Sequence, residues 1–175
     1  NLVAKLQAVG VNALGLTGAD IDMIRSHKRP LKEGIDFGYV GDVDSANGNM
    51  LHTIVEAGIV PVMAPLTHDG NGNILNTNAD TIASETAKAL APYYDVTLMF
   101  CFEKKGVLSN PDDDDSVIPS ITPEEFKALV ADGTVAGGMI PKLENSFNAI
   151  EHGVKQVVIT LASSIDGKHG TILRG

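Results

Sequence analysis

Short apolar runs alternate with segments of helical periodicity along this chain, and that alternation limits the fold more than any other feature. Runs such as Val96–Cys101 and Gln156–Leu161 have the length of strands that are buried on both faces. The segments between such runs carry apolar residues three and four positions apart. This alternation predicts an α/β protein with an open, mostly parallel sheet sandwiched between helices in three layers.

Hydrophobic periodicity and the positions of Gly, Pro and capping residues predict the individual helices and strands. Thr122 followed by Pro123 and two glutamates predicts a helix start, and Pro141 is expected at the first position of the next helix. The charged, Gly- and Pro-punctuated residues 21–41 suggest an outlying β-hairpin region. We expect helices over 2–9, 50–57, 78–91, 122–133 and 141–153, strands over 11–16, 59–64, 96–101 and 156–161, a hairpin and short strand up to 75, and an edge strand at 171–175.

Composition narrows the function classes. The chain has 175 residues and 22 acidic against 13 basic side chains, a net charge of −9, which disfavours nucleic acid and anionic membrane surfaces as partners. A single cysteine, Cys101, excludes an internal disulfide and a multi-thiolate zinc site within one chain. No apolar run approaches the roughly 20 residues of a membrane span. We expect one cytoplasmic domain, with no linker that divides it.

Common cofactor motifs are missing from the sequence. It contains neither the G-x-G-x-x-G fingerprint of dinucleotide sites nor the G-x-x-x-x-G-K-[ST] phosphate loop. The five histidines show no paired metal-ligand spacing, and no metal site built from protein groups alone is predicted. The four carboxylates of Asp112–Asp115 are either a solvated turn or a divalent-ion site.

Two segments carry polar residues that could act in catalysis. Asn76, Asn78 and Asp80 lie where a short strand turns into a helix, and open α/β sheets bind ligands at such edges. Asn78 could simply cap that helix, with Asp80 complementing its dipole, but this interpretation leaves Asn76 unexplained. Lys142 lies near a helix start, where the dipole disfavours a cation unless an anion binds there too. The alternative is a lysine that points into solvent.

Taken together, several segments resemble the amino acid kinase family, in particular its members that phosphorylate an N-acylated glutamate. The resemblance rests on residues 13–20, 38–43, 58–63, 72–80, 105–107 and 137–142, in order along nearly the whole chain. The Asn-x-Asn-Ala-Asp and Gly-Met-x-x-Lys elements are the most discriminating. It implies ATP-dependent phosphorylation of the γ-carboxylate of N-acetyl-L-glutamate or another N-acyl-glutamate in arginine biosynthesis, with Mg²⁺ accompanying ATP and a homodimer when intact.

The resemblance also implies roles for single residues. Lys142 matches the lysine on the nucleotide phosphates, Asp80 the carboxylate that orients the catalytic lysines, and Asn76 a residue that holds the amino acid substrate. Nucleotide-binding positions are matched by Glu103, Lys104, Lys105, Gly106, Val107, Thr134, Val135 and Ala136. Residues 1–80 or so would belong to the acyl-glutamate lobe, and about 81–175 to the nucleotide lobe.

Two departures qualify the resemblance. The family's first-strand lysine, its glycine loops and its substrate-binding arginine have no counterpart, so we expect the later portion of a longer chain, which would be inactive alone. Glu103-Lys104-Lys105 replaces a turn that more usually contains Asp. The alternative functions are another kinase of the family, acting on glutamate, aspartate, carbamate or UMP, and a nucleotide-binding module without catalysis.

Overall fold

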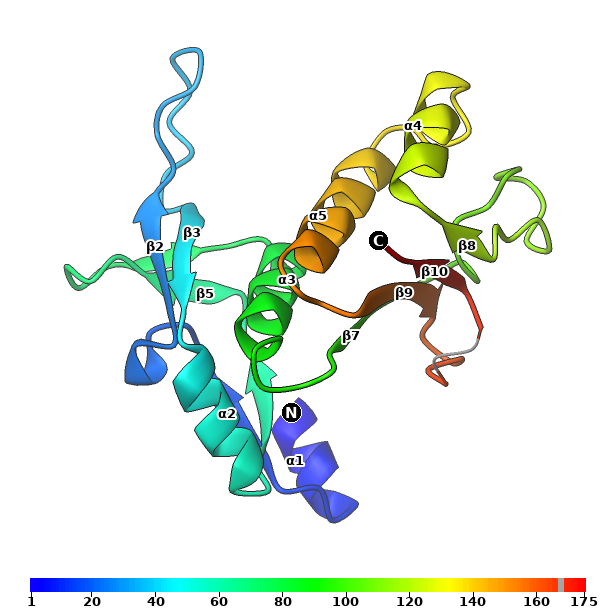
Figure 1. Cartoon of the computed structure of the whole chain (residues 1–175). Helices are drawn as coiled ribbons and strands as arrows, with labels where there is room; N and C mark the ends of the chain where they lie inside the picture. Colours follow the sequence, from blue (N-terminus) through cyan, green and yellow to red (C-terminus); the bar gives the residue numbers. More distant parts are fainter. Residues whose placement is uncertain (167–168) are drawn as a thin grey trace. The chain divides into compact units, whose positions relative to one another are not determined.

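Helices and short strands alternate along the chain in the computed structural model, which describes residues 1–166 and 169–175 (Figure 1). Contacts between residues divide the chain into two units, Asn1–Tyr93 and Tyr94–Gly175. The strands of the described residues form three hydrogen-bonded sheets, one of two strands and two of four. The α/β class predicted from the alternation of elements is confirmed.

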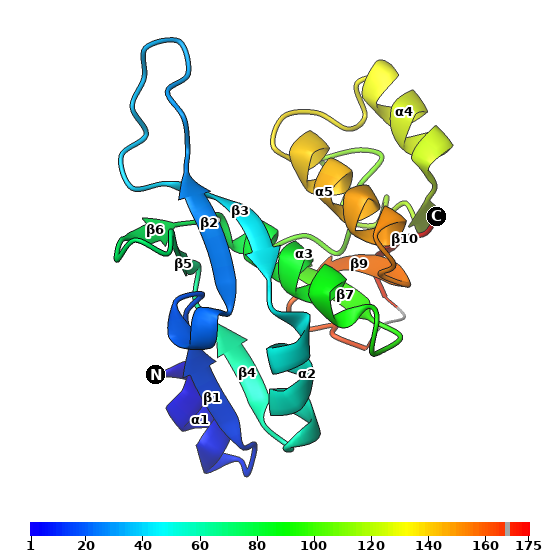
Figure 2. The same cartoon turned by 60° about the vertical axis from the view of Figure 1, so that its left-hand side comes forward.

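The first unit is built around a parallel pair of strands. β1 (Ala13–Leu16) and β4 (Val60–Met63) pair in register from Ala13 opposite Val60. α1 (Leu2–Ala8) lies beside β1, and α2 (Gly48–Glu56) lies beside β4 (Figure 2). α3 (Ala79–Leu90) packs on α2. The buried core consists of Leu16, Met23, Ile24, Leu51, Ile54 and Ile82.

The second sheet of this unit contains the predicted hairpin region. Its order is β3-β2-β5-β6, from β2 (Ile24–Lys28), β3 (Gly41–Ala46), β5 (Leu66–His68) and β6 (Ile74–Asn76). A 3-10 helix, η1 (Asp20–Asp22), leads into β2. Residues 29–40 extend as a long loop beyond the ends of β2 and β3 (Figure 2). The outlying hairpin is therefore confirmed.

The second unit carries a four-stranded sheet in the order β7-β9-β10-β8. β7 (Thr97–Phe102) and β9 (Gln156–Leu161) are parallel, and β10 (Thr171–Leu173) runs antiparallel to β9 but parallel to β8 (Ser120–Ile121). β9 has three successive core residues with no exposed area, Val157–Ile159, as its continuous apolar run predicts. α5 (Met139–Glu151) contacts β9, and α4 (Pro123–Ala131) contacts α5.

Three details of the sequence prediction are wrong. The strand at 171–175 is not an edge, because the two-residue strand β8 pairs with its outer side; so short a strand leaves no periodicity to detect. Pro141 is the third residue of α5, not the first, which is tolerated because the first four N–H groups of a helix have no intrahelical acceptor. α2 begins at Gly48, where the Asn47 side chain accepts the Met50 N–H at 3.1 Å.

Candidate functional site

A cavity of about 290 Å³ in the second unit is lined by residues from both segments that the sequence analysis assigned to nucleotide binding. One wall comes from the stretch after β7, and the other from the turn between α4 and α5. The lining residues are Phe102, Lys104, Gly106, Val107, Leu108, Pro111, Gly133, Thr134, Val135, Ala136 and Met139. Six of the eight predicted nucleotide residues are among them, while Glu103 and Lys105 are not.

The turn after α4 is held by its own backbone. The Val135 N–H donates to the Leu129 carbonyl at 2.8 Å, and the Thr134 N–H donates to Asp132 Oδ1 at 2.9 Å. The Thr134 backbone N–H, and then its hydroxyl, hold the pKa of the Asp132 carboxyl below its ordinary value. Val135 is almost fully buried, so this wall of the cavity is an apolar side chain on a fixed turn.

The sequence analysis missed several lining residues. Phe102, Leu108, Pro111 and Met139 carry no polar group that would mark them as ligand-binding. Each is close in sequence to a predicted segment, and that proximity was the only available signal. They make the cavity largely apolar, which suits the flat face of an aromatic ring system.

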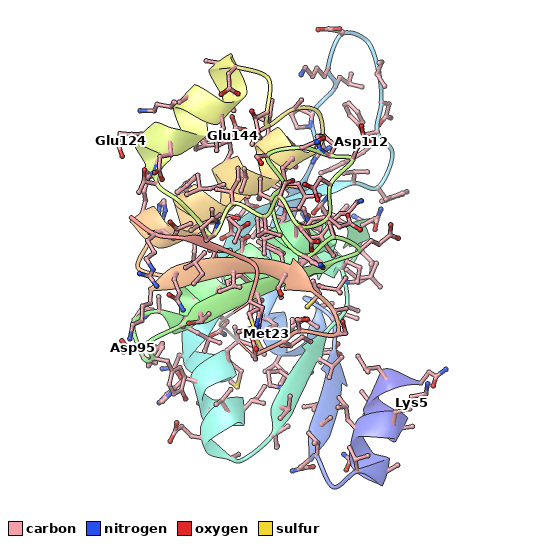
Figure 3. The ribbon with its side chains drawn as sticks, turned by 90° about the vertical axis from the view of Figure 1, so that its right-hand side faces the viewer. Lys5, Met23, Asp95, Asp112, Glu124 and Glu144 are labelled. Carbon is pink, nitrogen blue, oxygen red and sulfur yellow. The ribbon has the colours of Figure 1, made fainter. Side chains whose placement is uncertain are left out.

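The acidic run 112–115 is an exposed turn, as the solvated interpretation expects, and two of its carboxylates pair with lysines. Among the described residues it forms no group that could hold a metal ion. Asp114 Oδ1 lies 2.7 Å from Lys104 Nζ, and Asp115 Oδ1 lies 2.5 Å from Lys105 Nζ. These hydrogen bonds raise the pKa of both lysines, and the Lys104 contact lowers the pKa of the Asp114 carboxyl. Figure 3 labels Asp112 on the loop that carries this run. The loop thus places its carboxylates on the two lysines beside the cavity.

Lys142 contacts an aromatic side chain that lines the same cavity. Its Nζ is 4.1 Å from the ring centre of Phe102 and 4.9 Å from that of Phe100. Phe102 lines the cavity, whereas Phe100 is buried and is not among its lining residues. Lys142 is the fourth residue of α5, a helix whose start has no side-chain cap. A cation, two ring faces and the first N–H groups of a helix therefore share one region of the second unit.

Asn76 and Asp80 lie in the first unit, at the junction of β6 and α3. Asn76 is the last residue of β6, and its side chain is exposed. Its backbone N–H donates to the Tyr39 carbonyl at 2.7 Å. Asn78 caps α3 by accepting the N–H groups of Asp80 and Thr81 at 2.8 and 3.2 Å. The capping interpretation of Asn78 is thus confirmed. Asp80 is in the first turn of α3 and half-buried.

Within the described residues, no three His, Cys, Asp or Glu side chains are grouped so that they could hold a metal ion. Four of the five histidines face single carboxylates: His27 faces Asp44 at 2.7 Å, His68 faces Asp22 at 2.8 Å, and His52 faces Glu56 at 4.0 Å. The fourth, His169, faces Asp166. None of the helices in residues 1–166 and 169–175 is both long and apolar enough to cross a bilayer.

Comparisons with known proteins identify the family of the chain. The amino acid kinase family profile matches residues 1–161. An acetylglutamate kinase of Phocaeicola vulgatus is 67% identical over 99% of this chain, and one of Bacteroides thetaiotaomicron is 65% identical over 99%. The chain spans 67% of each of these relatives, about two thirds of their length.

A solved structure shares the fold at low sequence identity. N-acetylglutamate synthase from Neisseria gonorrhoeae, complexed with coenzyme A and N-acetyl-glutamate, superposes with a TM-score of 0.82 at 19% identity. The alignment covers 98% of this chain and 40% of that protein. The fold, the profile match and the identity to two relatives give the same answer: the chain belongs to the amino acid kinase family, on its acetylglutamate kinase branch.

Proposed function

We propose that the protein carrying this chain transfers the γ-phosphoryl group of ATP to the γ-carboxylate of N-acetyl-L-glutamate. The products are an acyl phosphate and ADP, and the step is the second of arginine biosynthesis. The observation that carries the proposal is the 67% identity to an acetylglutamate kinase over 99% of the chain. The cavity beside Lys142 is the structural feature that supports it.

The reaction asks for positioning and charge more than for covalent chemistry. A carboxylate oxygen forms a bond to the γ-phosphorus while the bond from phosphorus to the β,γ-bridging oxygen breaks. Lys142 is assigned the role of stabilising negative charge on the transferring group, together with the N–H groups at the start of α5. Its position over Phe102, a cavity-lining ring, supports this assignment.

The adenosine portion of ATP is assigned to the cavity of the second unit. Residues 103–107 and 134–136 would contact base and ribose, with Phe102 and Met139 supplying apolar surface. ATP would enter as its magnesium complex, because Mg²⁺ keeps several waters and binds mainly through substrate phosphates. This route for Mg²⁺ fits the side chains present, since the described residues contain no group of His, Cys, Asp or Glu that could hold a metal ion by itself.

The amino acid substrate is assigned to the first unit. Asn76 would hold the α-carboxylate region of the substrate, and Asp80 would orient the catalytic lysine. In this proposal residues up to about 80 serve the acyl-glutamate lobe and the rest serve the nucleotide lobe. A homodimeric, cytoplasmic enzyme completes the proposal.

Replacing Lys142 tests the proposed catalysis. Lys142→Ala should lower kcat by about 100-fold or more, as loss of a single charge-stabilising group does in other enzymes, while ATP affinity falls less. Lys127→Ala, which removes an exposed lysine of α4, is the matched control and should leave kcat unchanged. Steady-state kinetics and ATP titration measure both. A module without catalysis would show no phosphoryl transfer in the parent and would lose only ATP affinity in Lys142→Ala, and that result would exclude the kinase assignment.

Substrate analogues test the acceptor. The protein should phosphorylate N-acetylglutamate in preference to N-succinylglutamate, free glutamate, aspartate and carbamate, measured by coupled ADP release. Preference for the succinyl compound would keep the N-acyl-glutamate class and change the acyl group. Preference for an acceptor without an acyl group would move the protein to another branch of its family.

A further inference from the structure

A buried hydroxyl lies directly behind one wall of the cavity. Thr171 is the first residue of β10 and has no exposed surface. Its Oγ1 accepts the N–H of Val107 at 2.8 Å and donates to the carbonyl of Ile118 at 2.7 Å. A threonine hydroxyl has one proton, and here that proton and the oxygen lone pair each serve a different segment of the chain.

These contacts close a ring of hydrogen bonds. The Ile118 N–H donates back to the Val107 carbonyl at 2.8 Å, and the Ile172 N–H donates to the Pro119 carbonyl at 3.0 Å. Thr171 therefore joins both ends of the segment 107–118. Leu108 and Pro111, which line the cavity, lie within that segment.

Close packing at Gly106 fixes the same wall from the backbone side. A Cβ at Gly106 would lie 2.8 Å from Thr171 Oγ1, 3.0 Å from Thr171 N and 2.9 Å from Val117 Cγ1. Such distances are too short for any side chain, so the backbone at Gly106 lies against Thr171. Gly106 and Val107 both line the cavity, while Thr171 does not.

We infer that Thr171 is a positioning residue for the nucleotide: its hydroxyl sets the spacing between residues 106–107 and the segment that ends at Ile118. This inference rests on the proposed function, because it assumes that the cavity holds ATP. Thr171 touches no substrate; it acts through Gly106, Val107 and the 108–118 segment. Removing the hydroxyl leaves the buried Val107 N–H and the partly buried Ile118 carbonyl without this partner, so the wall must rearrange.

The test compares three variants of the protein that carries this chain. Thr171→Val keeps the shape and removes the hydroxyl, and Thr171→Ser keeps the hydroxyl. Thr160→Val is the matched control, because Thr160 is equally buried in β9 and its hydroxyl donates to the Ser164 carbonyl at 3.3 Å, away from the cavity lining. The dissociation constant for ATP, both KM values and the thermal midpoint are measured for each.

Thr171→Val should weaken ATP binding about tenfold and raise KM for ATP, since a buried donor and a partly buried acceptor lose their partner. KM for the amino acid substrate should stay within about twofold of the parent, and Thr171→Ser should restore ATP binding. ATP binding unchanged in Thr171→Val, or weakened equally in Thr160→Val, would overturn the inference. If Thr171→Val does not fold, Thr171→Ser decides: near-parental affinity supports the inference and a tenfold loss overturns it. A parent protein that binds no ATP would instead remove the proposed function.

Discussion

The cavity wall of the second unit and the long loop of the first unit are both extensions of a sheet, yet different forces hold them. The wall at residues 106–118 carries the exposed ion pairs of Lys104 with Asp114 and of Lys105 with Asp115, and it is tied in addition by neutral hydrogen bonds to Thr171, which has no exposed surface. The loop at residues 29–40 is tied by ion pairs in solvent. Arg29 contacts Asp42 at 2.6 Å with side chains about 40% exposed, and Lys28 contacts Asp36 at 3.3 Å.

That difference indicates which of the two regions can be displaced at a small cost in free energy. Exposed ion pairs contribute about 0–1 kcal/mol each and weaken with salt. A buried donor that loses its partner costs roughly 1–3 kcal/mol. Buried hydrogen bonds therefore suit a wall that must hold a ligand in fixed geometry. Exposed ion pairs suit a segment that can be displaced.

The largest expected effect is at Gly106. Gly106→Ala should lower the free energy of unfolding by about 1–3 kcal/mol and weaken ATP binding, because the new methyl group meets Thr171 backbone and cannot be accommodated. Gly15→Ala in β1 is the matched change in the first unit. Its methyl group would lie 3.3 Å from Val3 Cγ2, a side-chain end that can shift, so the expected loss is roughly 0.5 kcal/mol.

Urea unfolding and ATP titration measure both glycine variants. Equal losses at the two positions would contradict the view that the cavity wall is the more tightly fixed region. An unchanged ATP affinity in Gly106→Ala would separate stability from nucleotide binding at this wall.

Helix caps in the two units give the next effect. Asn78→Ala in the first unit and Thr122→Ala in the second each remove a side-chain acceptor from a helix start, and each should cost about 1 kcal/mol of unfolding free energy. Only Asn78→Ala should also lower kcat, since Asn78 fixes the first turn that carries Asp80, the residue assigned to orient the catalytic lysines. Kinetic constants and melting curves recorded together test this, and an equal kinetic effect of Thr122→Ala would count against it.

The smallest effect is the pH and salt dependence of the Arg29–Asp42 pair. The Arg29 hydrogen bond holds the pKa of the Asp42 carboxyl below its ordinary value. A lowered pKa in the folded state means that the pair stabilises the fold above the ordinary aspartate pKa, about 3.9, and that this contribution is lost as pH falls below it. Because both side chains are more than one-third exposed, we expect only a few tenths of a kcal/mol.

Asp42→Asn should therefore flatten the stability profile between about pH 5 and pH 2. About 1 M salt should reduce the difference between parent and variant near pH 7. Denaturant unfolding across this pH range provides the measurement. A variant that is several kcal/mol less stable at neutral pH, in low and high salt alike, would show that the loop is held as firmly as the cavity wall.

Local signals in the sequence predicted most elements correctly. Thr122 caps the start of α4 as predicted, and the structure adds a reciprocal capping box with Glu125, in which the Thr122 N–H donates to Glu125 Oε2 at 2.8 Å. The continuous apolar runs became β7 and β9, and β9 is buried as its run predicts. For β7 the expected burial on both faces is wrong, because this strand lies at the edge of the sheet and is exposed at Thr97 and Cys101. The two-residue strand β8 and the position of Pro141 were not predictable, since neither changes the local pattern.

The candidate site divides in the same way. Lys142, Asp80 and Asn76 could be selected because charged or amide side chains stand out against their local context, and their roles remain predictions. Phe102, Met139 and Thr171 could not be selected, because apolar and buried neutral side chains look like ordinary core residues. The pairing of Lys104 and Lys105 with Asp114 and Asp115 also escaped the sequence analysis, which had considered a metal site or a solvated turn for these aspartates.

By itself the sequence determined the α/β class, the position of most helices and strands, and the family of the chain, because these depend on period, caps and residue order. Only the tertiary structure decided that residues 102–111 and 133–139 face one cavity and that β10 lies inside the sheet. It also decided that a hydroxyl 64 positions from Val107 holds the cavity wall. The physical reason is that hydrogen bonds and packing between distant segments depend on how strands align in the sheet, which no local pattern specifies.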